Sequence, residues 1–379
     1  MSLPLEGVLV LDLSRVLAGP FCTMMLGDLG ARVVKVEHPE DGDVTRGWGP
    51  PYHAATGMSA YYLSVNRNKE SIALDLATPA GAESVRRLAA RADVLVENFP
   101  PGGMEKFGLS VPALRAANPR LVTMSITGFG RTGPDASAPG FDLLAQAGAG
   151  LMAITGAPDG EPTKSGVAVS DLLAGCYAAI GVLAALVARE RTGAGPHVET
   201  NLFSATLASL INVAQSALLT GEEAQRHGNA HAQIVPYRTF AASDGDFVLG
   251  VGTDRQFERL AALVGRPEWS GGGPWASNDA RVRDRAALER ELAAVFARDT
   301  RESWVARCRV AGIPAGPVRG PLEALRSETA RALKSVIEAQ GVAFVAPPIR
   351  VDGEEPRVAF PPALGADGER LRREFDLPE

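Results

Sequence analysis

Asp171 is the acidic side chain whose surroundings in the sequence best suit chemistry. A run of small residues from Gly166 to Ser170 leads to it, and the uncharged stretch Leu172 to Ala188 follows. The position predicts an N-cap, in which the carboxylate satisfies unpaired N–H groups at a helix start and contributes about 1 kcal/mol. It suits a covalent nucleophile equally well, because small neighbours let a substrate approach closely. The local sequence leaves both roles open.

Glycine patterns that bind nucleotides are incomplete or misplaced in this sequence. The segment Ser14 to Pro20 holds one glycine where the dinucleotide fingerprint needs three. A literal G-x-G-x-x-G occurs at Gly128 to Gly133, but Pro134 and Asp135 follow it where a helix would have to begin. We interpret it as a glycine loop at the carboxyl end of a strand. Nicotinamide chemistry is therefore a distant alternative, and no nicotinamide cofactor is expected.

Metal and serine-hydrolase chemistry are also disfavoured. Cys22, Cys176 and Cys308 are far apart, and His227 and His231 are separated by a Gly-Asn-Ala segment that does not favour a helix. Neither pattern has the spacing of a metal site, so we expect none. The sequence also lacks the G-x-S-x-G elbow of α/β-hydrolases.

Composition is that of an ordinary globular protein. The chain has 379 residues, of which 46% are hydrophobic and 22% charged, so it can build a core without disulfides. The net charge of −6 and the absence of a basic block argue against nucleic-acid and membrane partners. The uncharged stretch after Asp171 is shorter than the roughly 20 residues of a membrane span and predicts a core helix. Since the first residues also lack the pattern of a signal peptide, we expect a cytoplasmic protein.

Short, β-branched apolar segments before residue 130 predict buried parallel strands. These segments are Val8–Leu13, Arg32–Glu37, Ser71–Leu76, Asp93–Glu97 and Leu121–Ile126. Helices are predicted between them, with Pro20 near the start of one and Thr78-Pro79 at the start of another. The alternation predicts an α/β fold with a Rossmann-like, doubly wound sheet.

From residue 226 the pattern changes to that of a small α+β domain. Val235–Phe240 and Asp246–Val251 predict a hairpin around Ser243–Gly245. Helices are predicted at Gln256–Leu263, Arg285–Ala297 and Arg301–Ala311. We expect a large domain over residues 1–200, a linker helix over 201–225, a small domain over 226–320, and a return linker with the C-terminal part of the large domain over 321–379.

Blocks along nearly the whole chain resemble family III CoA-transferases, a superfamily with formyl-CoA transferase, carnitine CoA-transferase and α-methylacyl-CoA racemase. The N-terminal blocks are Leu11-Asp12, Ala18-Gly19-Pro20, Val34–Glu37, and Gly42-Asp43 with Arg46. The later ones include Leu95–Phe99, Asn118–Leu121, Gly128–Gly130, Asp171, Glu190–Gly193, Gly228-Asn229, Val235–Tyr237, Gly265–Glu268 and Gly312–Pro314. Their common order carries the resemblance more than any single block.

The resemblance implies a function as well as a fold. It implies a homodimer in which two ring-like chains interlock. Its substrates would be a carboxylic acid and coenzyme A in the form of acyl-CoA, with no metal and no nicotinamide. Asp171 takes the position of the nucleophile, which attacks the thioester to give an aspartyl–acyl anhydride. Returning CoA then forms an aspartyl-CoA thioester, from which an acceptor carboxylate takes over the CoA.

By position, the resemblance also assigns contacts with coenzyme A. These residues are Val16, Ala18, His38, Arg46, Leu74, Asp75, Asn98, Phe99 and Lys106. His38 and Lys106 stand where many relatives have arginine, which replaces a bidentate phosphate clamp by weaker point contacts. Arg46 is the candidate for the missing guanidinium.

An α-methylacyl-CoA racemase-like isomerase is the main alternative within the superfamily. It uses a histidine and an aspartate to move a proton, and its histidine would fall at Phe141. Because phenylalanine cannot transfer a proton, the sequence favours a CoA-transferase. A CoA-binding protein without activity ranks third.

Overall fold

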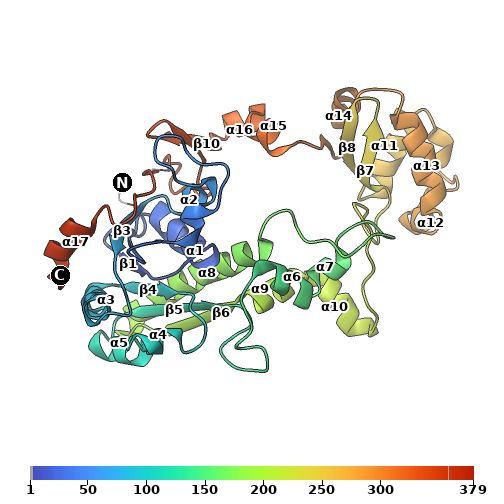
Figure 1. Cartoon of the computed structure of the whole chain (residues 1–379). Helices are drawn as coiled ribbons and strands as arrows, with labels where there is room; N and C mark the ends of the chain where they lie inside the picture. The colour runs from blue at the N-terminus through green and yellow to red at the C-terminus, as the bar shows by residue number, and fades with distance from the viewer. Residues whose placement is uncertain (1–2, 357) are drawn as a thin grey trace. The chain divides into compact units, whose positions relative to one another are not determined.

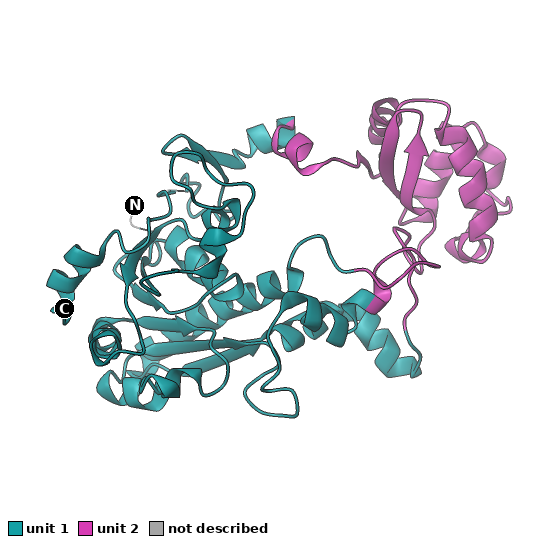
Figure 2. Ribbon diagram, in the orientation of Figure 1, with its two compact units in different colours: residues 1–152, 164–223, 328–379 teal, residues 153–163, 224–327 magenta. Residues whose placement is uncertain are grey.

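The structure, a computed structural model, describes residues 3–356 and 358–379. Its contacts define two compact units (Figure 2). The first holds the residues up to 152 together with 164–223 and those from 328 onward, and the second holds 153–163 and 224–327. Residues 153–163, which the sequence assigned to the large domain, thus pack with the second unit. The domain boundaries given above stay a prediction.

A six-stranded parallel sheet forms the centre of the first unit, in the order β3-β2-β1-β4-β5-β6 (Figure 1). The strands are β1 (Leu9–Asp12), β2 (Arg32–Glu37), β3 (Lys69–Ala73), β4 (Val94–Glu97), β5 (Val122–Thr127) and β6 (His197–Asn201). The five predicted strands are confirmed to within a few residues. The strand that sequence analysis missed, β6, lies at the sheet edge and is only partly buried, so its residues lack a continuous apolar run.

Helices cover both faces of this sheet. The helical elements up to residue 220 are α1 (Ala18–Asp28), α2 (Ala60–Val65), α3 (Pro79–Arg91), α4 (Gly103–Lys106), α5 (Val111–Ala117), α6 (Asp142–Gly148), α7 (Leu151–Ile154), α8 (Val169–Thr192), α9 (Leu202–Ser209), α10 (Ile211–Thr220) and the 3-10 turn η1 (Val44–Gly47). Successive residues of β1 point to opposite faces, so Val10 belongs to one apolar core and Leu11 to the other. The predicted start of α3 is confirmed, because Thr78 accepts the Gly81 N–H and Pro79 is the first helical residue.

The long helix α8 packs into the core of the first unit, as predicted from its uncharged sequence. Ala174, Ala178 and Val182 are fully buried together with residues of α1, β4 and β5. Among the described residues, α8 is the single helix that is long and apolar enough to cross a membrane, and α9 with α10 would qualify only as one bent pair.

The second unit is built on a three-stranded antiparallel sheet. Its elements are β7 (Tyr237–Ala242), β8 (Gly245–Gly250), α11 (Asp254–Leu263), η2 (Pro267–Trp269), α12 (Asn278–Arg283), α13 (Arg285–Phe296), α14 (Arg301–Val310), β9 (Ala315–Pro317) and α15 (Pro321–Leu325). The predicted hairpin and the three predicted helices are confirmed. An aromatic core holds the sheet against the helices, with the Phe296 ring centroid 5.0 Å from those of Phe240 and Trp304.

The C-terminal segment returns to the first unit. It comprises α16 (Glu328–Ala332), the hairpin β10 (Val336–Ala339) with β11 (Val342–Val345), and α17 (Gly368–Phe375). Leu371 and Phe375 of α17 are buried in the same core as Leu11, and Asp367 accepts the Ser71 N–H at 2.9 Å. Sequence analysis did not predict the short hairpin.

Candidate active site

The carboxyl ends of β1, β4 and β5 open onto a hollow of about 780 Å³ in the first unit. Loops that follow these strands line it, together with residues from α2, α6 and α8. The sheet order reverses between β1 and β4, and ligands of doubly wound sheets bind at such a switch point. A smaller hollow of about 260 Å³ lies beside the ends of β2 and β3, and Arg15 and Phe99 line both.

Asp171 lines the larger hollow from the first turn of α8. The predicted N-cap role is wrong, because the helix begins two residues earlier and Ala168 is its N-cap. The carboxylate instead lies beside the backbone N–H of Ala18, the first residue of α1, and this N–H stabilises its charge. Gly175, one turn further along α8, allows this approach, since a Cβ there would lie 2.8 Å from the Ala18 carbonyl oxygen. The nucleophile candidate is therefore held between two helix starts.

Burial raises the pKa of Asp171 from 3.8 to about 7, and the nearby charge of Asp142 adds to the increase, whereas the Ala18 N–H opposes it. Tyr61 of α2 responds to the same charges, and its own pKa is raised to about 12 by burial and by Asp171. A carboxylate that titrates near neutral pH is a better nucleophile than an ordinary one. The site thus suits covalent chemistry on Asp171.

Helix α6 holds the segment that leads to Asp171. Asp142 accepts the Ser170 N–H at 2.8 Å and the Gln146 side-chain amide at 2.7 Å. Gln146, one turn further along, accepts the Ser165 N–H at 2.9 Å. These two acceptors fix the backbone immediately before the nucleophile.

The glycine loop after β5 lies at the carboxyl end of its strand, as predicted. Gly128 touches Gly140, since a Cβ on Gly128 would lie 2.5 Å from the Gly140 Cα. This close approach brings the start of α6 to the hollow, where Phe141 is exposed and lines the wall next to Asp142. Phe141, which replaces the racemase histidine, thus lies in the same hollow as Asp171.

The structure gathers most of the residues predicted to contact coenzyme A. Val16, Ala18, Asn98 and Phe99 line the larger hollow, and His38, Leu74, Asp75 and again Phe99 line the smaller one. Their contacts with CoA stay predictions.

Arg46 and Lys106 stand apart from the lining residues of these two hollows. Two nitrogens of Arg46 bind the Glu37 carboxylate at 2.8 and 2.7 Å, and its guanidinium lies 3.8 Å from the centre of the Tyr62 ring. Lys106 is exposed at the end of α4. The guanidinium predicted for phosphate binding is therefore already occupied in this structure.

Sequence analysis did not propose Arg15, Lys164 and Asp142 as site residues. Arg15 is tied to Asn98 in both directions, since its N–H donates to Asn98 Oδ1 at 2.8 Å and its carbonyl accepts from Nδ2 at 2.7 Å. Its side chain lies 5.3 Å from the Phe99 ring centre. An arginine directly after the first strand was a usable signal for a phosphate contact. Lys164 and Asp142 carry no such signal, because only the fold brings them to Asp171.

No group of three or more His, Cys, Asp or Glu side chains is arranged to hold a metal ion in residues 3–356 and 358–379. The expectation that the reaction needs no metal stays a prediction.

Comparisons with known proteins agree on one family. The model described as CoA-transferase family III matches residues 5–368. Succinyl-CoA:glutarate CoA-transferase of Mus musculus is 45% identical over 83% of this chain and 72% of its own, and acetyl-CoA:oxalate CoA-transferase of Acetobacter aceti is 38% identical over 99% and 97%. The crystal structure of a CAIB/BAIF family protein from Brucella suis superimposes with a TM-score of 0.92 at 42% identity, covering 99% of this chain and 100% of that one.

Replacing Asp171 by Asn should stabilise the protein at pH 8. Unfolding lowers the pKa of the wild-type carboxyl from about 7 to near 4, so ionisation destabilises the folded state increasingly between pH 4 and pH 7. At pH 8 this amounts to roughly 2–4 kcal/mol, and Asn retains an oxygen that can accept the Ala18 N–H. Melting temperatures of wild type and Asp171→Asn, measured at pH 8 and at pH 5, test this. At pH 5 the stabilisation of the variant over wild type should be about a third of its value at pH 8. An equal difference at both pH values would contradict the raised pKa.

Proposed function

The chain belongs to CoA-transferase family III and is a CoA-transferase, and we propose that it moves coenzyme A from an acyl-CoA to a carboxylic acid through intermediates on Asp171. The observation that carries the proposal is the placement of Asp171. Its carboxylate lines the large hollow at the switch point of the sheet, buried enough to titrate near neutral pH. Phe141 in the same hollow disfavours the racemase alternative.

The proposed reaction begins at the thioester carbon. An oxygen of Asp171 attacks it, the C–S bond breaks, and the CoA thiolate leaves behind an aspartyl–acyl anhydride. The thiolate then attacks the aspartyl carbonyl, which releases the donor acid and leaves an aspartyl-CoA thioester. The acceptor carboxylate attacks this thioester, the C–S bond breaks, and the CoA thiolate leaves behind an aspartyl–acceptor anhydride. The thiolate finally attacks the acceptor's carbonyl carbon in this anhydride, which releases the Asp171 carboxylate and gives the acceptor's CoA thioester. Water would hydrolyse each intermediate, so a site shielded from solvent favours transfer.

Two adjoining hollows support the binding of a long cofactor. Arg15 and Phe99 line both, so a CoA molecule bound along them would pass these two residues on its way to Asp171. We place the phosphates near Arg15 and His38 and the thioester in the larger hollow. A guanidinium is a strong phosphate ligand because it offers several fixed donors.

For the acceptor we propose a dicarboxylic acid. The relatives named above act on glutarate and on oxalate, both of which carry two carboxylates. Lys164 lines the hollow that contains Asp171, and it offers a positive charge for the carboxylate that does not react.

We further propose a cytoplasmic homodimer, with the interlocked rings that the resemblance implies. Helix α8 exposes Ile180 and Val187, and α10 exposes Leu218 and Leu219 at 81% and 78% of their surface. Large exposed apolar side chains are typical of a protein–protein interface where they form a patch. These side chains support a second copy of the chain as the partner.

Hydroxylamine should trap the acylated or CoA-bound Asp171 as a hydroxamate. An anhydride or thioester is an activated carboxyl that reacts with hydroxylamine, whereas the resting carboxylate does not. Incubation with acyl-CoA and hydroxylamine, followed by peptide mass spectrometry, should show the mass change on Asp171. Asp171→Asn should show neither the modification nor transfer activity.

A label on Cys176 would contradict this proposal. Cys176 lies on the same helix, but burial raises the pKa of its thiol and disfavours the reactive thiolate. Acylation of Cys176 with Asp171 unmodified would identify a thiol as the nucleophile.

Arg15→Ala and Lys106→Ala each remove the positive charge of one exposed side chain, so their effects on KM can be compared directly. Arg15 lines both hollows, so its loss should raise the KM for acyl-CoA about tenfold while leaving the KM for the acid within about twofold. Lys106 should have the smaller effect, because it lies outside the residues that line them. Steady-state kinetics with each substrate varied in turn make the comparison, and a larger effect at Lys106 would favour the contact predicted from sequence.

A further inference from the structure

Four charged side chains are buried beneath the loop between β1 and α1, and the proposed reaction uses none of them. Asp12 and Lys35 are 0% exposed, Asp43 is 1% and Lys69 is 5% exposed. Lys35 Nζ lies 3.0 Å from Asp43 Oδ2, and Lys69 Nζ lies 3.0 Å from Asp12 Oδ2. Buried ion pairs are weak sources of stability, because desolvation offsets most of their attraction. Their contacts therefore need another explanation.

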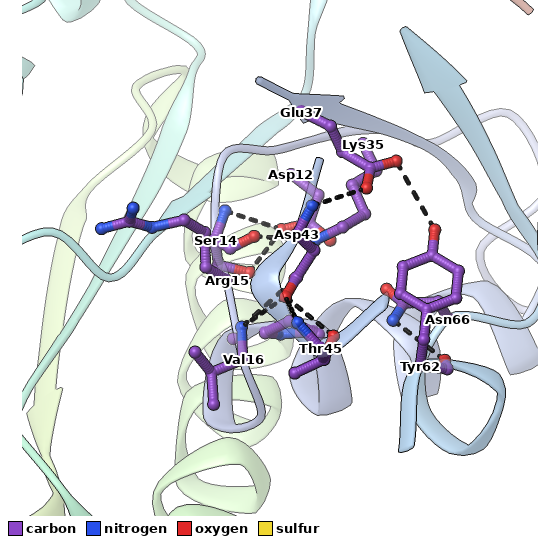
Figure 3. Close-up of polar contacts among 12 residues, drawn as sticks. Asp12, Ser14, Arg15, Val16, Lys35, Glu37, Asp43, Thr45, Tyr62 and Asn66 are labelled. Atoms are coloured by element: carbon purple, nitrogen blue, oxygen red, sulfur yellow. Dashed lines mark hydrogen bonds and ion pairs between the residues drawn. The ribbon is translucent and has the colours of Figure 1, made fainter. Parts of the chain in front are cut away.

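The cluster binds backbone groups of the β1–α1 loop, as Figure 3 shows. Asp12 Oδ1 accepts the Ser14 N–H at 3.0 Å, and Lys35 Nζ donates to the Ser14 carbonyl at 2.8 Å. The Asp43 carboxylate accepts the Val16 N–H, with its oxygens 3.3 and 3.2 Å from the nitrogen. Because Arg15 is held by Asn98, consecutive residues of the loop are all fixed by side chains.

Val16 needs this support because its backbone is strained. Its φ is +70°, in the left-handed region that a β-branched residue rarely adopts. Such a conformation persists only where the surroundings fix it, and it concentrates at functional sites. Two residues later α1 begins with Ala18, which lines the same hollow as Asp171 and whose N–H stabilises the Asp171 carboxylate. The conformation of Val16 thus sets the direction from which the chain enters α1.

Burial alone would raise the pKa of Asp43, but Lys35 and the donors of Thr45 outweigh it and hold the pKa below its usual range. Asp43 is therefore ionised at neutral pH and presents two oxygens. Thr45 donates its N–H and hydroxyl to Oδ1 at 3.0 and 2.8 Å, which fixes the carboxylate from the side opposite the loop.

We propose that Asp43 is a positioning residue for the transfer reaction: together with Lys35 it holds Val16 in the left-handed conformation and so directs the Ala18 N–H at Asp171. This inference rests on the proposed role of Asp171 as nucleophile. Asp43 acts through the loop and does not contact the reacting atoms.

Asp43→Asn is the direct test, since it keeps the size of the side chain but removes its charge and one acceptor oxygen. We expect kcat to fall on the order of 10- to 100-fold, as for other small displacements of reacting groups. The KM for acyl-CoA should stay within about threefold. The acidic limb of kcat/KM should also move to higher pH, because loss of the Ala18 N–H removes the interaction that favours ionised Asp171.

Other groups that act on Asp171 should keep their effect in this variant. Asp142 of α6 and Tyr61 of α2 face it, and Arg15 and Lys164 line the same hollow. The substitution changes none of these groups. A shift in the acidic limb of kcat/KM would therefore result from a changed conformation of the β1–α1 loop.

Val16→Gly tests the same inference without touching the buried charges. Glycine adopts a positive φ readily, so this variant should melt at or above the wild-type temperature. Its loop is no longer restricted to one conformation, and we expect kcat to fall and the acidic limb to move in the same direction as in Asp43→Asn. Loss of a CoA contact alone, since the Val16 side chain also lines the larger hollow, would raise the KM for acyl-CoA and leave the acidic limb in place. If Asp43→Asn does not fold, the kinetics of Val16→Gly test the inference by themselves.

Tyr62→Phe is the matched control, because it removes a buried hydroxyl from the neighbouring contacts of Arg46 and Glu37 but leaves the loop alone. It should lower the melting temperature and leave the acidic limb in place. Two results would overturn the inference. One is a wild-type kcat with an unmoved acidic limb of kcat/KM in both Asp43→Asn and Val16→Gly. The other is a shift of the acidic limb in Tyr62→Phe as large as in these two variants. If hydroxylamine traps Asp171 in the wild type while the loop variants behave normally, only this inference fails. If Asp171 is not trapped, the proposed function itself fails.

Discussion

The approach of the Ala18 N–H to the Asp171 carboxylate is the contact on which the site depends. It joins the first residue of α1 to the first turn of α8, two elements far apart in the sequence. Unpaired N–H groups at a helix start favour an anion, so α1 can hold a carboxylate that α8 supplies. Gly175 permits the approach, and the β1–α1 loop directs it. The parallel sheet matters to function mainly because it holds these two helix starts together.

The electrostatic balance at Asp171 suits a group that must attack and later leave. Burial and Asp142 raise its pKa, whereas the Ala18 N–H keeps part of its charge stabilised. A carboxylate in water would be a weak nucleophile, and one with several donors would be weaker still. With only the Ala18 N–H as a donor and the like charge of Asp142 nearby, the Asp171 carboxylate is more reactive and less stabilised than an ordinary one. The destabilisation of the folded state at pH 8 is the thermodynamic counterpart of that reactivity.

Local patterns were sufficient to predict five of the six strands of this sheet, because runs such as Arg32–Glu37 are buried on both faces. They also predicted the start of α3 at Thr78-Pro79. They failed where a distant contact decides. Asp171 was predicted to cap its own helix, whereas its carboxylate faces the N–H of Ala18. The sequence shows which residues precede and follow Asp171, but it does not show that α1 approaches it. Sequence also gave no sign that Glu37 binds the guanidinium of Arg46, whose assignment to a phosphate stays a prediction. Lys164 and Asp142 reach the site only through the fold.

The buried charges of the first unit follow from the same geometry. A loop that crosses the end of a sheet leaves backbone N–H and carbonyl groups without partners in any helix or strand, and such groups cannot stay buried unpaired. An apolar pair at positions 35 and 43 would avoid the desolvation penalty of the two charges, but it could bind neither the Ser14 carbonyl nor the Val16 N–H. Lys35 comes from the middle of β2, so its backbone is rigid and its side chain reaches the loop from the sheet. A strained loop above a reactive carboxylate thus requires charges in the core beneath it.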